Sequence, residues 1–164
     1  MIRVAAFTVA LLAIAAGPTR ATERFESAPA IAGVHSPCRD IRGVEVVTYK
    51  VVNLGDVGFA RRVNRIPIIM IDPHILAGLP PKLQLFFYLH ECGHHALGHW
   101  DIRPASAESD ADCWAITRAR DWGELLRTEV EQFEPFLARS NGSPFGHLAG
   151  PARERHLLQC YDER

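Results

Sequence analysis

The longest regular pattern of apolar positions in this chain runs from residue 83 to residue 97. Apolar or imidazole side chains recur there at three- and four-residue spacing, which places them on one face of a helix. The positions concerned are Leu83, Phe86, Phe87, His90, His94 and Leu97. Pro81 suits the first turn of a helix and Gly98 suits its end. The pattern therefore predicts a helix over about residues 81–98.

Two shorter runs before this helix predict β-strands. Residues 44–52 (VEVVTYKVV) are rich in β-branched side chains and are followed by a turn signal at residues 53–56. Residues 65–71 (RIPIIMI) form the second run. Because Pro67 has no N–H for a β-ladder, either this strand lies at the edge of a sheet or Pro67 lies near the start of the strand.

The rest of the chain has mainly helical spacing. Ser106 is a possible cap for a helix that extends to about residue 122, and Gly123 interrupts the pattern. A third helix is predicted over residues 124–139 and a short final helix over residues 151–161. Two strands and four helices correspond to a small α+β fold.

The first 21 residues have the layout of a secretory signal peptide. Arg3 precedes an apolar block over residues 4–16, and a glycine, a proline and small residues follow. The block is shorter than the roughly 20 apolar residues of a spanning helix. We therefore expect an exported protein, periplasmic or extracellular, without a stable membrane span; an uncleaved amino-terminal anchor is the alternative. Residues 22–164 are then expected to form a single domain.

Composition agrees with one folded domain. The 164 residues are 48% hydrophobic and 23% charged, which argues against disorder. The formal net charge of -1 excludes the broad basic surface of a nucleic-acid binder. Four of the eight histidines fall within residues 90–99, so the chemistry is expected to lie there.

Four cysteines bear on the fold in an oxidising compartment. Cys38, Cys92, Cys113 and Cys160 form no CxxC pair, and an even count in an exported protein favours disulfide bonds. Four cysteines allow three connectivities. A bridge between Cys38 and Cys160 would tie both ends of the domain together, which leaves Cys92 to pair with Cys113. Buried free thiols are the alternative.

Residues 90–94 (HECGH) match the HExxH pattern of zinc metallopeptidases. Residues four apart on a helix share a face, so His90 and His94 could bind one zinc ion while Glu91 meets the metal-bound water as general base. The alternative is a solvated polar patch. His95 points about 100° away from His94 on the helix, and His99 lies near the helix end, where its charge suits the helix dipole.

A catalytic zinc site usually has three protein ligands, so a third is needed. The metzincin class would place a histidine at position 100 and a glycine at position 97, and this chain has Trp100 and Leu97. Residues 108–112 (ESDAD) supply carboxylates instead. Glu108 can be the third ligand, and Asp112, four residues later on the same helical face, can hold the free ring nitrogen of a ligand histidine.

These motifs together resemble the gluzincin metallopeptidases. HECGHHALGH (residues 90–99) followed by ESDADCWA (residues 108–115) is similar to the HExxHxxxxH and ExxAD pair of the HtpX and CAAX prenyl protease branch. The similarity covers about residues 66–160. It implies a minimal zincin-like domain, in which a small sheet with an edge strand packs on the HExxH helix and an ExxAD helix follows. The membrane helices of that branch are missing here.

The resemblance also implies roles for individual residues. In this family His90, His94 and Glu108 would bind one zinc ion per chain, and Glu91 would be the catalytic base. Asp112 would hold the free ring nitrogen of a histidine ligand. A segment around His147 is similar to the HP…R segment of the family, which makes His147 a transition-state donor, although Leu148 stands where the family has proline.

The expected function is therefore hydrolysis of peptide bonds by a zinc-dependent endopeptidase. A peptide or protein substrate is expected to lie extended along the edge of the strand at residues 65–71. The main alternative is a zinc-binding exported module that is catalytically silent and acts in partner binding or regulation. A further alternative is a disulfide-linked domain that binds no metal.

Overall fold

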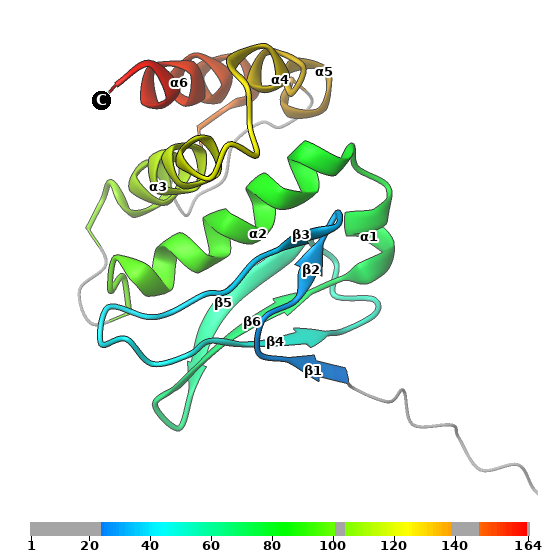
Figure 1. The fold of residues 1–164 in the computed structure, drawn as a ribbon, viewed down its shortest axis with the longest axis vertical. Helices are drawn as coiled ribbons and strands as arrows, with labels where there is room; N and C mark the ends of the chain where they lie inside the picture. Colours follow the sequence, from blue (N-terminus) through cyan, green and yellow to red (C-terminus); the bar gives the residue numbers. More distant parts are fainter. Residues whose placement is uncertain (1–23, 101–103, 139–147, 164) are drawn as a thin grey trace, which may run out of the picture.

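The computed structural model describes residues 24–100, 104–138 and 148–163. The expected signal peptide, residues 1–21, lies outside these residues. A β-sheet lies on one side of helix α2 (Pro81–Ala96), α3 (Ala107–Asp121) packs on the other side, and α6 (Gly150–Asp162) lies beyond α3 (Figure 1). The expected α+β fold is confirmed, and α2 is its central element.

The main sheet has four strands in the order β1 (Arg24–Glu26), β4 (Val47–Lys50), β6 (Ile66–Ile71) and β5 (Gly58–Val63). Strands β4 and β6 are parallel, whereas the two outer pairs are antiparallel. A separate two-stranded sheet pairs β2 (Ala30–Ile31) with β3 (Val34–His35).

Strand β6 is an inner strand, so the expectation of an edge strand at residues 65–71 is wrong. The strand at that edge is β5, which sequence analysis missed. Pro67 is the second residue of β6, which confirms the alternative that Pro67 lies near the start of its strand. Strand β6 pairs with β4 only from Ile68 onward. The missing N–H of Pro67 therefore removes no bond from the β4 ladder.

Helix α2 is buried on two sides because the sheet and α3 both cover it. Leu83, Leu85 and Leu89 are at most 1% exposed. Toward the sheet, the Tyr88 hydroxyl lies 3.2 Å from Thr48 Oγ1. Gly98, with a φ of 73°, turns the chain away just after the helix. Packing on two faces therefore fixes the positions of the buried side chains of α2, which include His90 and His94.

The other helices agree with the sequence patterns in part. Helices α3 and α6 are confirmed, while residues 124–139 contain two short helices, α4 (Arg127–Glu131) and α5 (Glu134–Leu137), in place of one. Pro135 is in the first turn of α5 and has no N–H to continue a longer helix. The sequence patterns also missed α1 (Pro73–Ala77), which begins at Asp72; the Asp72 carboxylate accepts hydrogen bonds from His74 N and Ile75 N.

Two disulfide bonds join neighbouring layers. Cys38 pairs with Cys92 of α2, and Cys113 of α3 pairs with Cys160 of α6, with Cα separations of 5.8 and 5.0 Å. The favoured pairing of Cys38 with Cys160, and of Cys92 with Cys113, is wrong. Cys38 is bonded to α2, whereas Cys160 belongs to α6, and α3 packs between these two helices.

Gly93 marks the closest approach of α2 and α3. A Cβ atom at Gly93 would lie 3.2 Å from both Ala111 Cα and Ala111 O. Gly93→Ala is therefore expected to lower the free energy of unfolding by about 1–3 kcal/mol, as overpacking does. In an uncrowded helix the same change stabilises by up to about 1 kcal/mol. Denaturant unfolding measures whether the variant is less or more stable than the wild type. A variant at least as stable as the wild type would contradict the close approach of the two helices.

Candidate metal centre

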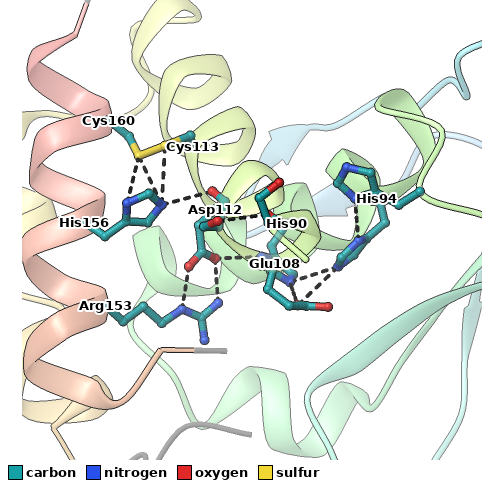
Figure 2. Close-up of polar contacts among 11 residues, drawn as sticks. His90, His94, Glu108, Asp112, Cys113, Arg153, His156 and Cys160 are labelled. Atoms are coloured by element: carbon teal, nitrogen blue, oxygen red, sulfur yellow. Dashed lines mark hydrogen bonds and ion pairs between the residues drawn. A yellow bond between two sulfur atoms is a disulfide. The ribbon is translucent and has the colours of Figure 1, made fainter. Parts of the chain in front are cut away.

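Helices α2 and α3 bring three potential metal ligands together. His90 and His94 lie four residues apart on α2, and Glu108 lies in the first turn of α3. All three residues are buried, with exposures of 2%, 6% and 3%. Gly93 lies between the two histidines and lets the α3 backbone approach. Figure 2 shows the three side chains converging from the two helices.

The donor atoms form a nearly equilateral triangle. His90 Nε2 lies 3.3 Å from His94 Nε2 and 3.3 Å from Glu108 Oε2, and His94 Nε2 lies 3.5 Å from Glu108 Oε2. Ligands about 2.0–2.1 Å from a tetrahedral zinc ion lie about 3.3–3.4 Å from one another. The three residues therefore form a candidate metal-binding group whose spacing fits zinc.

Charge in this region also favours a cation. Burial alone would lower the pKa of His90, but hydrogen bonds to Asp112 and Glu108 and the negative charges of Asp112 and Glu91 outweigh burial and raise the pKa to about 9. The surroundings of His90 thus stabilise a positive charge. A protonated imidazole or a metal ion meets that requirement.

Each histidine of the group has a partner for its second ring nitrogen. His90 Nδ1 lies 2.7 Å from Asp112 Oδ1, and His94 Nδ1 lies 3.0 Å from His99 Nδ1. Such contacts fix the ring orientation and the tautomer of a metal ligand. His99 is the last histidine of the HExxHxxxxH match, but the sequence suggested for it only a role at the helix end. Its spacing of five residues from His94, across the turn at Gly98, was a signal for this contact.

Asp112 is held in turn by Arg153 of α6. The guanidinium donates to both carboxylate oxygens, with distances of 2.8 and 2.6 Å, and both side chains are buried. Burial would raise the pKa of Asp112, but hydrogen bonds and charge from His90 and Arg153 outweigh burial and lower the pKa to about 2. Arg153 is the arginine of the segment that is similar to HP…R, but nothing in the sequence indicated its contact with Asp112, because 41 residues separate the two.

Glu91 lies between α2 and the edge strand β5. Its Oε2 accepts a hydrogen bond of 2.6 Å from the Ala60 N–H. Burial raises the pKa of Glu91, opposed by the charges of His90 and His94 and by the Ala60 bond. A carboxylate with a raised pKa beside the metal-binding group is suited to accept and release a proton.

His95 belongs to the sheet side of α2 and not to the metal-binding group. Its Nε2 donates 2.9 Å to the Ile68 carbonyl of β6, and its side chain is fully buried. Burial lowers the pKa of His95 from 6.5 to about 4. Folding therefore favours the neutral ring.

This pKa shift predicts a pH dependence of stability. Between pH 6.5 and about pH 4 the unfolded chain binds a proton at His95 that the folded chain does not. The neutral His95 ring therefore contributes about 3 kcal/mol to the free energy of unfolding above pH 6.5, and this contribution is lost as the pH falls toward 4. His95→Gln can keep the bond to Ile68, so urea unfolding should show a flatter profile for this variant. The exposed His35→Gln serves as control, and identical slopes for all three proteins would contradict the shift.

His147 lies outside the described residues, so the structure does not place it. His156 of α6 lies beside the bridge between Cys113 and Cys160 (Figure 2). No helix within the described residues is long and apolar enough to cross a membrane.

Comparison with known proteins gives no match: no family model fits the chain, and no curated protein or solved structure is similar to it. The functional conclusion therefore depends on the geometry of the site.

Proposed function

We propose that this chain is an exported zinc-dependent endopeptidase of the gluzincin type. The observation that carries the proposal is the triangle of donor atoms from His90, His94 and Glu108, with sides of 3.3–3.5 Å. Two imidazoles and one carboxylate are the ligand set of several zinc peptidases. Glu91, next to His90 on the same helix, supplies the carboxylate that peptide hydrolysis requires.

Each residue has a distinct task in this reaction. Zinc held by the three ligands would supply an acidic water and an electrophile for the peptide carbonyl. Glu91 accepts the proton of the attacking water and passes it to the leaving amine nitrogen. Asp112 and His99 accept from the Nδ1–H groups of His90 and His94, so that the Nε2 lone pairs face the metal position.

The substrate would lie along β5, the edge strand found in the structure, and not along β6. The Ala60 N–H points out of the sheet toward Glu91. In an antiparallel strand the backbone groups of every second residue point to the same side, so those of Gly58 and Arg62 face outward as well. An extended peptide could pair with these groups, which favours recognition of the main chain over particular side chains.

Two disulfide bonds support the proposed export, because such bridges persist in oxidising compartments. One bridge joins Cys38 to α2 and the other joins α3 to α6. Helices α2 and α3 hold the metal-binding group, and α6 holds Arg153. A periplasmic or extracellular location is therefore part of the proposal.

The proposal is tested by measuring metal content and peptide cleavage together. The full chain, purified without a metal-affinity tag, is expected to hold one zinc ion and to cleave members of a peptide library. A chelator should abolish cleavage, and added zinc should restore it. Cleavage that persists after the metal has been removed would contradict the proposal.

A catalytically silent zinc module is the second candidate, and one observation favours it. The Ala60 N–H already occupies one oxygen of Glu91, at 2.6 Å. If that bond persists with substrate bound, only the other oxygen of Glu91 can accept a proton. One zinc ion per chain with no cleavage of any library peptide would support this candidate over the peptidase.

A further inference from the structure

A second group of metal-binding side chains lies on the outer side of α3, away from the first. Cys113 projects from α3, while His156 and Cys160 lie four residues apart on one face of α6 (Figure 2). His156 Nε2 is 3.5 Å from Cys113 Sγ and 3.6 Å from Cys160 Sγ. Two sulfur atoms and one imidazole nitrogen thus meet between two helices.

The bridge in this group is more accessible than the other one. Cys160 is only 1% exposed, but its partner Cys113 and the neighbouring His156 are partly exposed, whereas Cys38 and Cys92 are both 1% exposed. A dithiol reductant that attacks Cys113 Sγ would break the S–S bond and release Cys160 as a thiolate beside His156. The second thiol of the reductant then resolves the mixed disulfide. The bridge gains two electrons and two protons, and the reductant becomes a disulfide.

We propose that Cys113, His156 and Cys160, once reduced, form a second zinc site. Thiolate and imidazole ligands select zinc among the common divalent ions of biology. Ligands about 2.3 Å (sulfur) and 2.0–2.1 Å (nitrogen) from a tetrahedral zinc ion lie about 3.5–3.6 Å apart. The two nitrogen–sulfur distances already have this value, so only the two sulfurs must separate.

Protons also balance in this step. In the bridged form, the His156 Nε2–H donates to the Ser109 carbonyl oxygen at 3.0 Å. Zinc binding displaces this proton to Nδ1 and releases one proton from each thiol to solvent. The product has two thiolates and a neutral imidazole on one zinc ion, with the fourth position open to water.

Such a site would keep α3 and α6 linked after the bridge is reduced. Asp112 is adjacent to Cys113, and Arg153 lies one turn before His156 on α6. A link at this point therefore holds the Asp112 and Arg153 pair that supports His90. The metal would replace the covalent bond under reducing conditions. This inference does not depend on the proposed peptidase activity.

Cobalt(II) provides a probe specific to this site, because only thiolate ligands give an intense near-ultraviolet sulfur-to-cobalt charge-transfer band. The His90, His94 and Glu108 group contains no sulfur and cannot produce it. The full chain, reduced with a phosphine that adds no competing thiol, is expected to develop this band as cobalt is added and to reach saturation by two equivalents, because the His90, His94 and Glu108 group can take up cobalt as well. Two equivalents of zinc should then remove the band. The oxidised chain should show none.

Variants assign the band to particular residues. His156→Gln leaves both cysteines in place and should weaken cobalt binding by at least about tenfold, since even residues behind the ligands contribute that much. Cys113→Ser should remove most of the band. The controls His35→Gln and Cys38→Ser/Cys92→Ser should retain it. The proposal is overturned if reduced wild type shows no band, if His156→Gln binds like wild type, or if the band disappears in the Cys38 and Cys92 variant.

Discussion

Glu91→Gln is expected to lower peptide hydrolysis by about 10²- to 10⁴-fold, the usual contribution of a general base, while one metal ion per chain is retained. The glutamine oxygen can still accept the bond from the Ala60 N–H, so the side chain stays in place. The amide cannot accept the proton of the attacking water. The measurement is kcat/KM on a cleaved library peptide, with metal content determined on the same sample.

The pH profile provides a second readout of the same residue. Burial raises the pKa of Glu91, so the acid limb of kcat/KM should lie above the ordinary range of a carboxylate and should be absent in Glu91→Gln. The exposed Glu134→Gln is the matched control and should behave like wild type. Full activity in Glu91→Gln would place the base elsewhere, and loss of the metal together with activity would show that Glu91 acts in folding or binding.

The spacing of residues along the chain was enough to predict which side chains of the candidate site lie together when they belong to the same helix. The four-residue interval between His90 and His94 determines a shared face in any helix, and the apolar pattern indicated that a helix was present. Glu108 and Asp112 have the same interval on α3. The structure places these four side chains in contact, with His90 between Glu108 and Asp112.

Contacts between distant segments could not be predicted in this way. Strand β5 was missed because Arg61 and Arg62 interrupt its apolar alternation, and without β5 the strand at β6 was taken for an edge. The disulfide pairing depends on which layers are adjacent, which spacing along the chain does not encode. Arg153 belongs to this class as well, because it reaches Asp112 only after α6 has packed on α3.

Arg153→Leu tests this long-range contact and is expected to lower the free energy of unfolding by about 3–5 kcal/mol. The substitution leaves the Asp112 carboxylate buried with only His90 as a charged partner, and breaking a buried ion pair from one side costs about that much. Leucine retains apolar contact near Phe86, over whose ring the guanidinium lies at 5.5 Å. Denaturant unfolding with metal-free protein measures the effect.

Two further variants separate the charge from the packing. Arg155→Leu, an exposed position on the same helix, should change stability by no more than about 0.5 kcal/mol. Asp112→Asn combined with Arg153→Leu removes both charges, and the asparagine oxygen can still accept from His90 Nδ1. The double variant should therefore regain a large part of the lost stability. If it is no more stable than Arg153→Leu alone, the loss arises from packing of α6 and not from an unpaired carboxylate.

Metal affinity provides the decisive comparison, because the hydrogen bonds described for Arg153 go to Asp112, which in turn supports a ligand of the metal-binding group. Arg153 bonds Asp112, and Asp112 bonds Nδ1 of His90. Loss of a residue that supports a metal ligand typically lowers affinity by about 10- to 100-fold. Arg153→Leu should therefore weaken zinc binding by that factor at a temperature where the variant is still folded, whereas Arg155→Leu should not. Unchanged affinity in a folded Arg153→Leu protein would show that α6 stabilises the fold without positioning His90.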